Sequence, residues 1–77
     1  MNAFFRTPAV PGYGARIWLL RDERQDIKTE LNHLSMWGGV DKTDGNWMAW
    51  EFGAEQFTQA IDFLVGNHCF TEIKSRL

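Results

Sequence analysis

The chain has 77 residues, of which 44% are hydrophobic and 23% are charged, and its formal net charge is −2. This length accommodates one domain, the composition is that of a globular protein rather than a disordered one, and no apolar run approaches the roughly 20 residues of a membrane helix. With 8 basic and 10 acidic residues, the chain lacks the basic surface that binding along a phosphate backbone requires.

The beginning of the chain is predicted to be an arm. Residues 1–13 contain Pro8, Pro11 and Gly12 and do not resemble a signal peptide. Within this arm, Phe4 and Phe5 either anchor it to the core or form a short edge strand. The remaining residues, 14–77, are expected to form a single α+β domain. The single cysteine permits no internal disulfide and favours a cytoplasmic location.

The first half of the domain is predicted to be a strand followed by a helix. Residues 15–20 (ARIWLL) are typical of a strand, and the spacing of the apolar residues after position 25 is typical of an amphipathic helix. Asp22 is expected to cap this helix, Glu23 lies in its first turn, and the pair of glycines at 38 and 39 ends it. Trp37, next to these glycines, is expected to cover the end of the helix. The apolar stripe comprises Ile27, Leu31 and Leu34.

The second half is predicted to be a hairpin, a helix and a last strand. Residues 40–42 and 47–52 form the two strands of the hairpin, and 43–46 (TDGN) form its turn, in which Gly45 supplies a positive φ. A helix opens at 53–54 and stops at Gly66-Asn67, and residues 69–74 (CFTEIK) form the last strand. The apolar stripe of this helix comprises Phe57, Ala60, Ile61 and Leu64.

The order strand, helix, strand, strand, helix, strand predicts a ferredoxin-like fold. In this α+β arrangement a four-stranded antiparallel sheet carries both helices on one face. An alternative fold pairs residues 4–7 with residues 15–20 in an N-terminal hairpin, which gives a meander with two helices.

The sheet is expected to place several aromatic residues on the face without helices. Side chains alternate between the two faces of a strand, so the uncharged set Met48, Trp50 and Phe52 should face the helices. Trp47 and Glu51 then share the other face with Arg16 and Trp18 of the first strand. Either both indoles are exposed there, or the N-terminal arm folds over them. Phe63 lies off the apolar stripe of its helix, so it either packs against the last strand or the chain end at Leu77, or is an exposed interface residue.

The sequence contains no motif that indicates catalysis, a metal site or a cofactor. His68 and Cys69 are adjacent, so on a strand their side chains point to opposite faces, and His33 lies off the apolar stripe of its helix. No glycine-rich phosphate loop is present. We therefore expect a protein that is not an enzyme and that binds no metal and no cofactor.

Two classes of function remain. The first is a protein-binding module whose interface comprises Arg16, Trp18, Trp47, Glu51 and Phe63, because Trp and Arg dominate interface energetics. The second is a single-stranded nucleic-acid binder that stacks bases on Trp18 and Trp47. The net charge favours the protein partner.

In size and composition the whole chain resembles the small inhibitor proteins encoded by phages and mobile elements, among them the anti-CRISPR proteins. It is a short, mildly acidic domain that begins with Met, is rich in Trp and lacks catalytic residues. The resemblance rests on no motif, so it carries over no residue. It implies a monomer or homodimer in the host cytoplasm that blocks a host defence or nucleic-acid-processing complex. A bacterial interaction domain of another kind is the alternative within this class.

Overall fold

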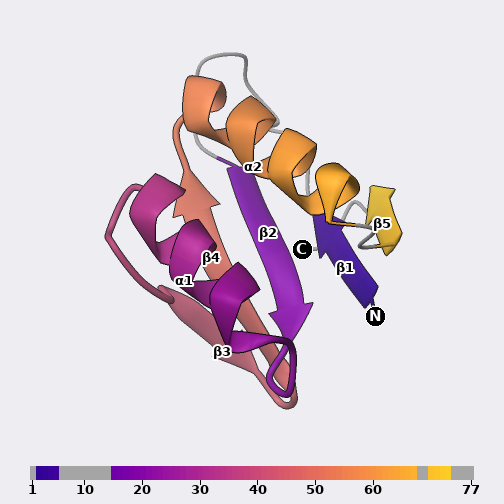
Figure 1. Ribbon diagram of the computed structural model, residues 1–77. Helices are drawn as coiled ribbons and strands as arrows, with labels where there is room; N and C mark the ends of the chain where they lie inside the picture. The colour runs from indigo at the N-terminus through magenta and orange to yellow at the C-terminus, as the bar shows by residue number, and fades with distance from the viewer. Residues whose placement is uncertain (1, 6–14, 68–69, 74–77) are drawn as a thin grey trace.

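A computed structural model describes residues 2–5, 15–67 and 70–73 of the chain as five strands and two helices (Figure 1). In chain order these elements are β1 (Asn2–Phe5), β2 (Ala15–Leu20), α1 (Gln25–Leu34), β3 (Lys42–Asp44), β4 (Trp47–Phe52), α2 (Ala54–Gly66) and β5 (Phe70–Ile73). Both helices lie on the same face of the sheet (Figure 1). The predicted α+β class, with two helices and an antiparallel unit of three strands (β3, β4 and β2), is confirmed.

The strand order differs from the predicted ferredoxin-like sheet. Strands β3, β4 and β2 form an antiparallel unit, β1 adds to β2 in antiparallel orientation, and β5 pairs with β1 in parallel. In a ferredoxin-like sheet β5 would pair directly with β2, whereas here β1 lies between them. The ferredoxin-like topology is therefore not confirmed. The predicted arm contains β1, whose pairing with β2 matches the alternative N-terminal hairpin, shifted to Asn2–Phe5.

Helix α1 is shorter at both ends than predicted. It begins at Gln25 rather than after Asp22, because the N–H of Glu23 donates to the carbonyl of Leu20 and holds this segment in a turn. Arg24 therefore occupies the N-cap position without making a side-chain cap. At the other end, Ser35 has extended backbone angles and its N–H donates to Leu31, so the helix ends before the two glycines.

The hairpin lies two residues later than predicted on its first strand. Strand β3 begins at Lys42, and Asp44 pairs with Trp47, so the turn consists of Gly45 and Asn46 alone. Gly45 has a φ of 61°, the left-handed conformation expected at the first position of a two-residue hairpin turn. Helix α2 begins and ends where the sequence predicts, between Gly53 and Asn67.

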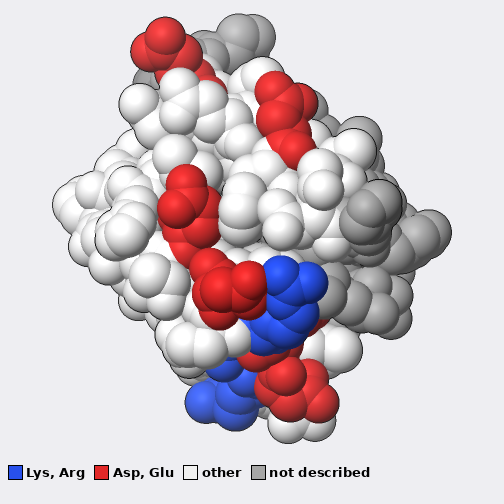
Figure 2. Space-filling model, in the orientation of Figure 1, with Lys and Arg blue, Asp and Glu red and all other residues white. Residues whose placement is uncertain are grey.

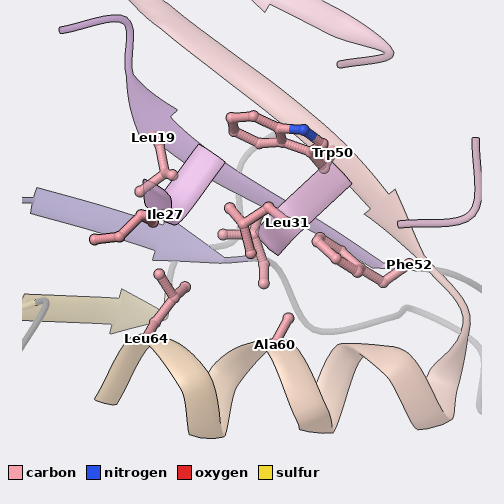
Figure 3. Packing of buried hydrophobic residues seen from close by; sticks show 8 residues of the cluster. Leu19, Ile27, Leu31, Trp50, Phe52, Ala60 and Leu64 are labelled. Atoms are coloured by element: carbon pink, nitrogen blue, oxygen red, sulfur yellow. The ribbon is translucent and has the colours of Figure 1, made fainter. Parts of the chain in front are cut away.

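The core lies between the sheet and the two helices (Figure 3). Each of β2, β4, α1 and α2 contributes two fully buried side chains: Ile17 and Leu19, Trp50 and Phe52, Ile27 and Leu31, and Ala60 and Leu64. Trp50 also satisfies its one polar atom, because its indole N–H donates to Oδ1 of Asn32 at 2.6 Å. The predicted alternation along β4 is thus confirmed, with Trp50 and Phe52 facing the helices and Met48 packed beside them.

Candidate interaction surface

The face of the sheet opposite the helices, here called the outer face, carries the alternate residues of β2 and β4. Cross-strand pairs join Arg16 with Glu51, Trp18 with Ala49, and Leu20 with Trp47. Paired residues share a face, so the structure brings together four of the five predicted interface residues: Arg16, Trp18, Trp47 and Glu51.

The centre of the outer face is buried. Trp18 retains 8% of its surface exposed, Ala49 is fully buried, and Trp47 packs partly buried against this pair. The alternative in which both indoles are solvent-exposed is therefore wrong for Trp18, while Trp47 remains accessible in part. In the other alternative the N-terminal arm, residues 1–13, covers the indoles, but residues 1 and 6–13 of this arm lie outside the described residues.

Phe63 does not belong to this face. It is half-buried on α2 and packs against the main core, on the helix side of the sheet. Of the two alternatives for Phe63, packing and exposure, the structure shows packing, and the contact is with the core cluster. Phe63 is therefore separated from the other four predicted residues by the sheet.

A loop at the β4 edge of the sheet adds residues that the sequence did not single out. Residues 36–41, here called the edge loop, connect α1 to β3. The N–H of Met36 donates to the carbonyl of Glu51 at 2.7 Å, and the N–H of Asp41 donates to the carbonyl of Ala49 at 2.9 Å. The two carbonyl acceptors, Ala49 and Glu51, are two positions apart on β4, whereas the two N–H donors, Met36 and Asp41, are five positions apart. The residues between the donors, 37–40, therefore loop out from β4.

The re-entry of the edge loop into the sheet is a β-bulge. Ala49 of β4 has Lys42 as its register partner and also accepts the N–H of Asp41, so two residues of one strand oppose one residue of the other. This bulge lets Asp41 approach Arg16 on the outer face. The loop itself turns at Gly38, whose φ of 76° suits glycine.

The edge loop concentrates exposed apolar surface. Among the described residues, the exposed large hydrophobic side chains are Met36, Trp37, Val40 and Val65. The first three belong to the edge loop, and Trp37 is the most exposed of the four, at 67%. Apolar residues gathered in this way mark an interaction site more often than single ones do.

A chain of polar contacts fixes the Trp37 ring to the outer face. Its indole N–H donates to Oε1 of Glu51 at 2.9 Å. Nη2 of Arg16 lies 3.6 Å from the same carboxylate oxygen and 2.7 Å from Oδ2 of Asp41. These three charged side chains, Arg16, Asp41 and Glu51, are here called the charge network. Their side chains are only 15–25% exposed, so solvent screens their interaction less than it screens a surface pair.

The charge network is incompletely paired. Arg16 and Asp41 make one short contact instead of the two parallel hydrogen bonds of a bidentate pair. Nε of Arg16 and Oδ1 of Asp41 are buried and have no hydrogen-bond partner among the described residues. With one cation and two carboxylates, the network has a net charge of −1.

The described residues suggest binding chemistry at this surface. Nowhere among residues 2–5, 15–67 and 70–73 do three or more His, Cys, Asp or Glu side chains lie close enough together to hold a metal ion. The charge network offers hydrogen bonding and charge pairing, and Trp37 beside it offers an exposed indole. None of the described helices has both the length and the apolar character to cross a membrane.

The helix-bearing face has a different character (Figure 2). Acidic side chains are spread across it, and the Lys and Arg side chains of the described residues appear in this view toward the end where β2 leads into α1. There Arg24 pairs with Asp26 at 2.7 Å, and this hydrogen-bonded contact lowers the pKa of Asp26. The described residues form no broad basic surface on this side of the molecule.

Trp37 is the main residue that sequence reasoning misplaced. It stands next to Gly38, so it was expected to cover the end of α1, but it is 67% exposed and its indole N–H donates to Glu51 of β4. The available signal was the Gly-Gly pair at 38 and 39, flanked by apolar residues that fit no periodic stripe.

Comparisons with protein-family models, with curated proteins and with solved structures give no significant match for this chain.

Proposed function

We propose that this protein is a small binding module that recognises another protein through Trp37 and the charge network behind it. The observation that carries the proposal is that Trp37 is 67% exposed and yet its indole N–H is hydrogen-bonded to Glu51. No catalytic role is proposed for any residue of this surface.

The energetics of Trp37 support an interface role. A Trp side chain buries about 150–250 Å² when it is covered, so covering the 67% that is exposed removes about 100–170 Å² from water. At roughly 25 cal/mol per Å², this burial is worth about 2.5–4 kcal/mol. Because the hydrogen bond to Glu51 already restricts the ring, less conformational entropy is lost on binding.

Two observations favour a protein partner over single-stranded nucleic acid, the alternative considered from the sequence. Trp18 is buried, so it offers no exposed ring on which a base can stack. Trp37 is exposed, but its hydrogen-bond partner is a carboxylate, which repels a phosphate group. The net charge of −2 acts in the same direction.

The kind of partner follows from the resemblance in size and composition. We propose that the protein acts as an inhibitor of the phage-encoded type, which occupies a surface of a host defence or nucleic-acid-processing complex. An exposed aromatic patch on a small domain suits such a blocking role, because blocking a surface needs no catalytic chemistry.

The proposal is tested with three immobilised baits: the wild-type chain, Trp37→Ala, and Val65→Ala as the matched control. Val65 is 59% exposed but lies on α2, away from the edge loop, so its truncation removes exposed apolar surface elsewhere. A protein captured from a lysate of the producing cells by the wild type and the control, and not by Trp37→Ala, is then purified. Calorimetric titration should give an affinity at least ~30-fold weaker for Trp37→Ala, which corresponds to about 2 kcal/mol.

Equal affinity of the partner for wild type and Trp37→Ala would contradict the proposal. Circular dichroism of the variant should remain unchanged, because Trp37 lies outside the core clusters. A steep fall of wild-type affinity with salt, together with binding of a mixed oligonucleotide, would instead favour the nucleic-acid function.

A further inference from the structure

We infer that the Trp37 site accepts an arginine side chain presented by the protein partner. This inference rests on the proposed function and names the chemistry of the group that Trp37 recognises. It is argued from the position of one carboxylate relative to one exposed ring.

The hydrogen bond to Glu51 involves only the edge of the Trp37 indole and leaves its two faces unoccupied by Glu51. An indole N–H lies in the plane of the ring, so Oε1 of Glu51, 2.9 Å from Nε1, sits at the ring edge. The side chain of Trp37 is nevertheless 67% exposed, which leaves ring surface open to a partner. The ring edge carries partial positive charge and is matched by the carboxylate, while the ring face is electron-rich.

A cation stacked on this ring is attracted by two groups together. The electron-rich face of a Trp attracts a cation within about 6 Å of the ring centroid. The Glu51 carboxylate lies at the edge of the same ring and adds a charge attraction. Arg16 offsets this attraction only in part, because it lies 2.7 Å from Asp41 and 3.6 Å from Glu51, and the charge network keeps a net charge of −1.

Arginine fits this arrangement better than lysine. Its guanidinium is planar and stacks on an aromatic face, and its N–H groups form a fixed fork that can reach a carboxylate at the ring edge. A lysine ammonium is compact and strongly hydrated, so it gains less from the ring face. An acidic or phosphorylated group is disfavoured by Glu51 itself.

The inference is tested on the full-length, isotope-labelled chain by following the indole N–H resonances in nuclear magnetic resonance titrations. The probes are the peptide acetyl-Gly-Gly-Arg-Gly-Gly-amide and its twin with citrulline, which has nearly the same shape and no charge. The arginine peptide should shift the Trp37 resonance and bind about five- to tenfold more tightly than the citrulline twin. The Trp18 and Trp50 resonances serve as internal controls, since both rings are buried.

Two variants separate the contributions of ring and charge. Glu51→Gln keeps an acceptor oxygen for the indole and removes the charge, so the preference for arginine should fall to about twofold or less. Trp37→Leu keeps an apolar side chain without an aromatic face and retains only the charge of Glu51, so the preference should fall below the wild-type value; binding by this variant is followed through the backbone amide resonances of the edge loop. Val65→Ala should leave both affinities unchanged.

Equal affinity for the arginine and citrulline peptides overturns the inference, as does a lack of any Trp37 shift at millimolar arginine peptide. An unchanged preference in Glu51→Gln also overturns it. These failures differ from failure of the proposed function, which is read from the purified partner. If the purified partner requires Trp37 while the peptides show no charge preference, the proposed binding function is supported and only the inference about arginine is wrong.

Discussion

Replacing Arg16 by Met should destabilise the domain by about 2–3 kcal/mol at neutral pH. The substitution keeps most of the apolar stem and removes the only cation of the charge network. Breaking a buried ion pair costs about 3–5 kcal/mol, and breaking an exposed one costs about 0–1 kcal/mol. The side chains of Arg16 and Asp41 are 23% and 15% exposed, so this pair lies nearer the buried limit. The loss is a large part of the 5–15 kcal/mol that stabilises a typical domain.

The free energy of unfolding is measured by urea denaturation followed by tryptophan fluorescence. Without Arg16, Asp41 keeps a largely buried charge with no cation beside it, and Glu51 loses its only ion-pair partner among the described residues.

A double mutant tests whether the Arg16–Asp41 pair itself causes the loss in the free energy of unfolding. Arg16→Met combined with Asp41→Leu removes both charges together with the unpartnered Nε and Oδ1 atoms, so this double variant should be more stable than Arg16→Met alone. A loss below about 0.5 kcal/mol in the single variant, or additive losses in the double variant, would refute the reasoning.

Three further predictions concern the turn, the core and the start of α1. Gly45→Val should destabilise the domain by more than ~1 kcal/mol in urea denaturation, because valine is strained at a φ of 61°; a neutral result would contradict the turn described here. Trp50→Ala should cost about 3–5 kcal/mol, because it empties a fully buried site and leaves Oδ1 of Asn32 without its donor; a loss under 1 kcal/mol would be incompatible with this core. Asp26 should titrate below the ordinary aspartate pKa of about 3.9, and Arg24→Gln should raise its pKa toward that value in a nuclear magnetic resonance titration. Because the folded-state pKa of Asp26 is lowered, its contact with Arg24 stabilises the protein above pH ~3.9, and this contribution is lost as the pH falls through the folded-state pKa. If the pKa of Asp26 is unchanged in Arg24→Gln, Arg24 is not the cause of the lowered pKa.

The turn prediction has a matched control in Gly66. A Cβ atom added at Gly45 or at Gly66 would meet no atom within 4 Å, but only Gly45 has a positive φ. Gly66→Ala should therefore be neutral or slightly stabilising, whereas Gly45→Ala should destabilise the domain, and the difference between these two alanine variants isolates the backbone conformation.

The elements that depend on local signals were predictable from the sequence. Helix α2 has a four-residue apolar stripe and is bounded by glycine, and its bounds agree with the prediction. The start of α1 was not predictable in this way, because Asp22 suits a turn as well as an N-cap and the Leu20–Glu23 hydrogen bond selects the turn. The strand order was missed because the parallel pairing of β1 with β5 joins the two ends of the chain, and no local pattern encodes it.

The candidate site was likewise predictable only where it depends on a local pattern. The period of two along β2 and β4 was enough to place Arg16, Trp18, Trp47 and Glu51 on one face. Their exposure was not predictable, because it depends on what covers the sheet. Trp37 was missed for another reason: its position depends on where α1 ends and on a bulge in the following strand, and neither follows from residue spacing.

The edge loop also affects how this sheet can meet other sheets. Strand β3 forms one edge of the sheet, and a foreign strand could add there only along its unpaired backbone. The edge loop is bonded to β4 through Met36, moves away from it over residues 37–40 and pairs with it again at the bulge. Strand β3 is therefore limited to Lys42–Asp44, three exposed residues with a charge at each end. Short, charged edges resist addition of a further strand. The protein can therefore expose an indole beside this edge without presenting a long ladder for aggregation, and a deletion that straightened the loop would remove that protection.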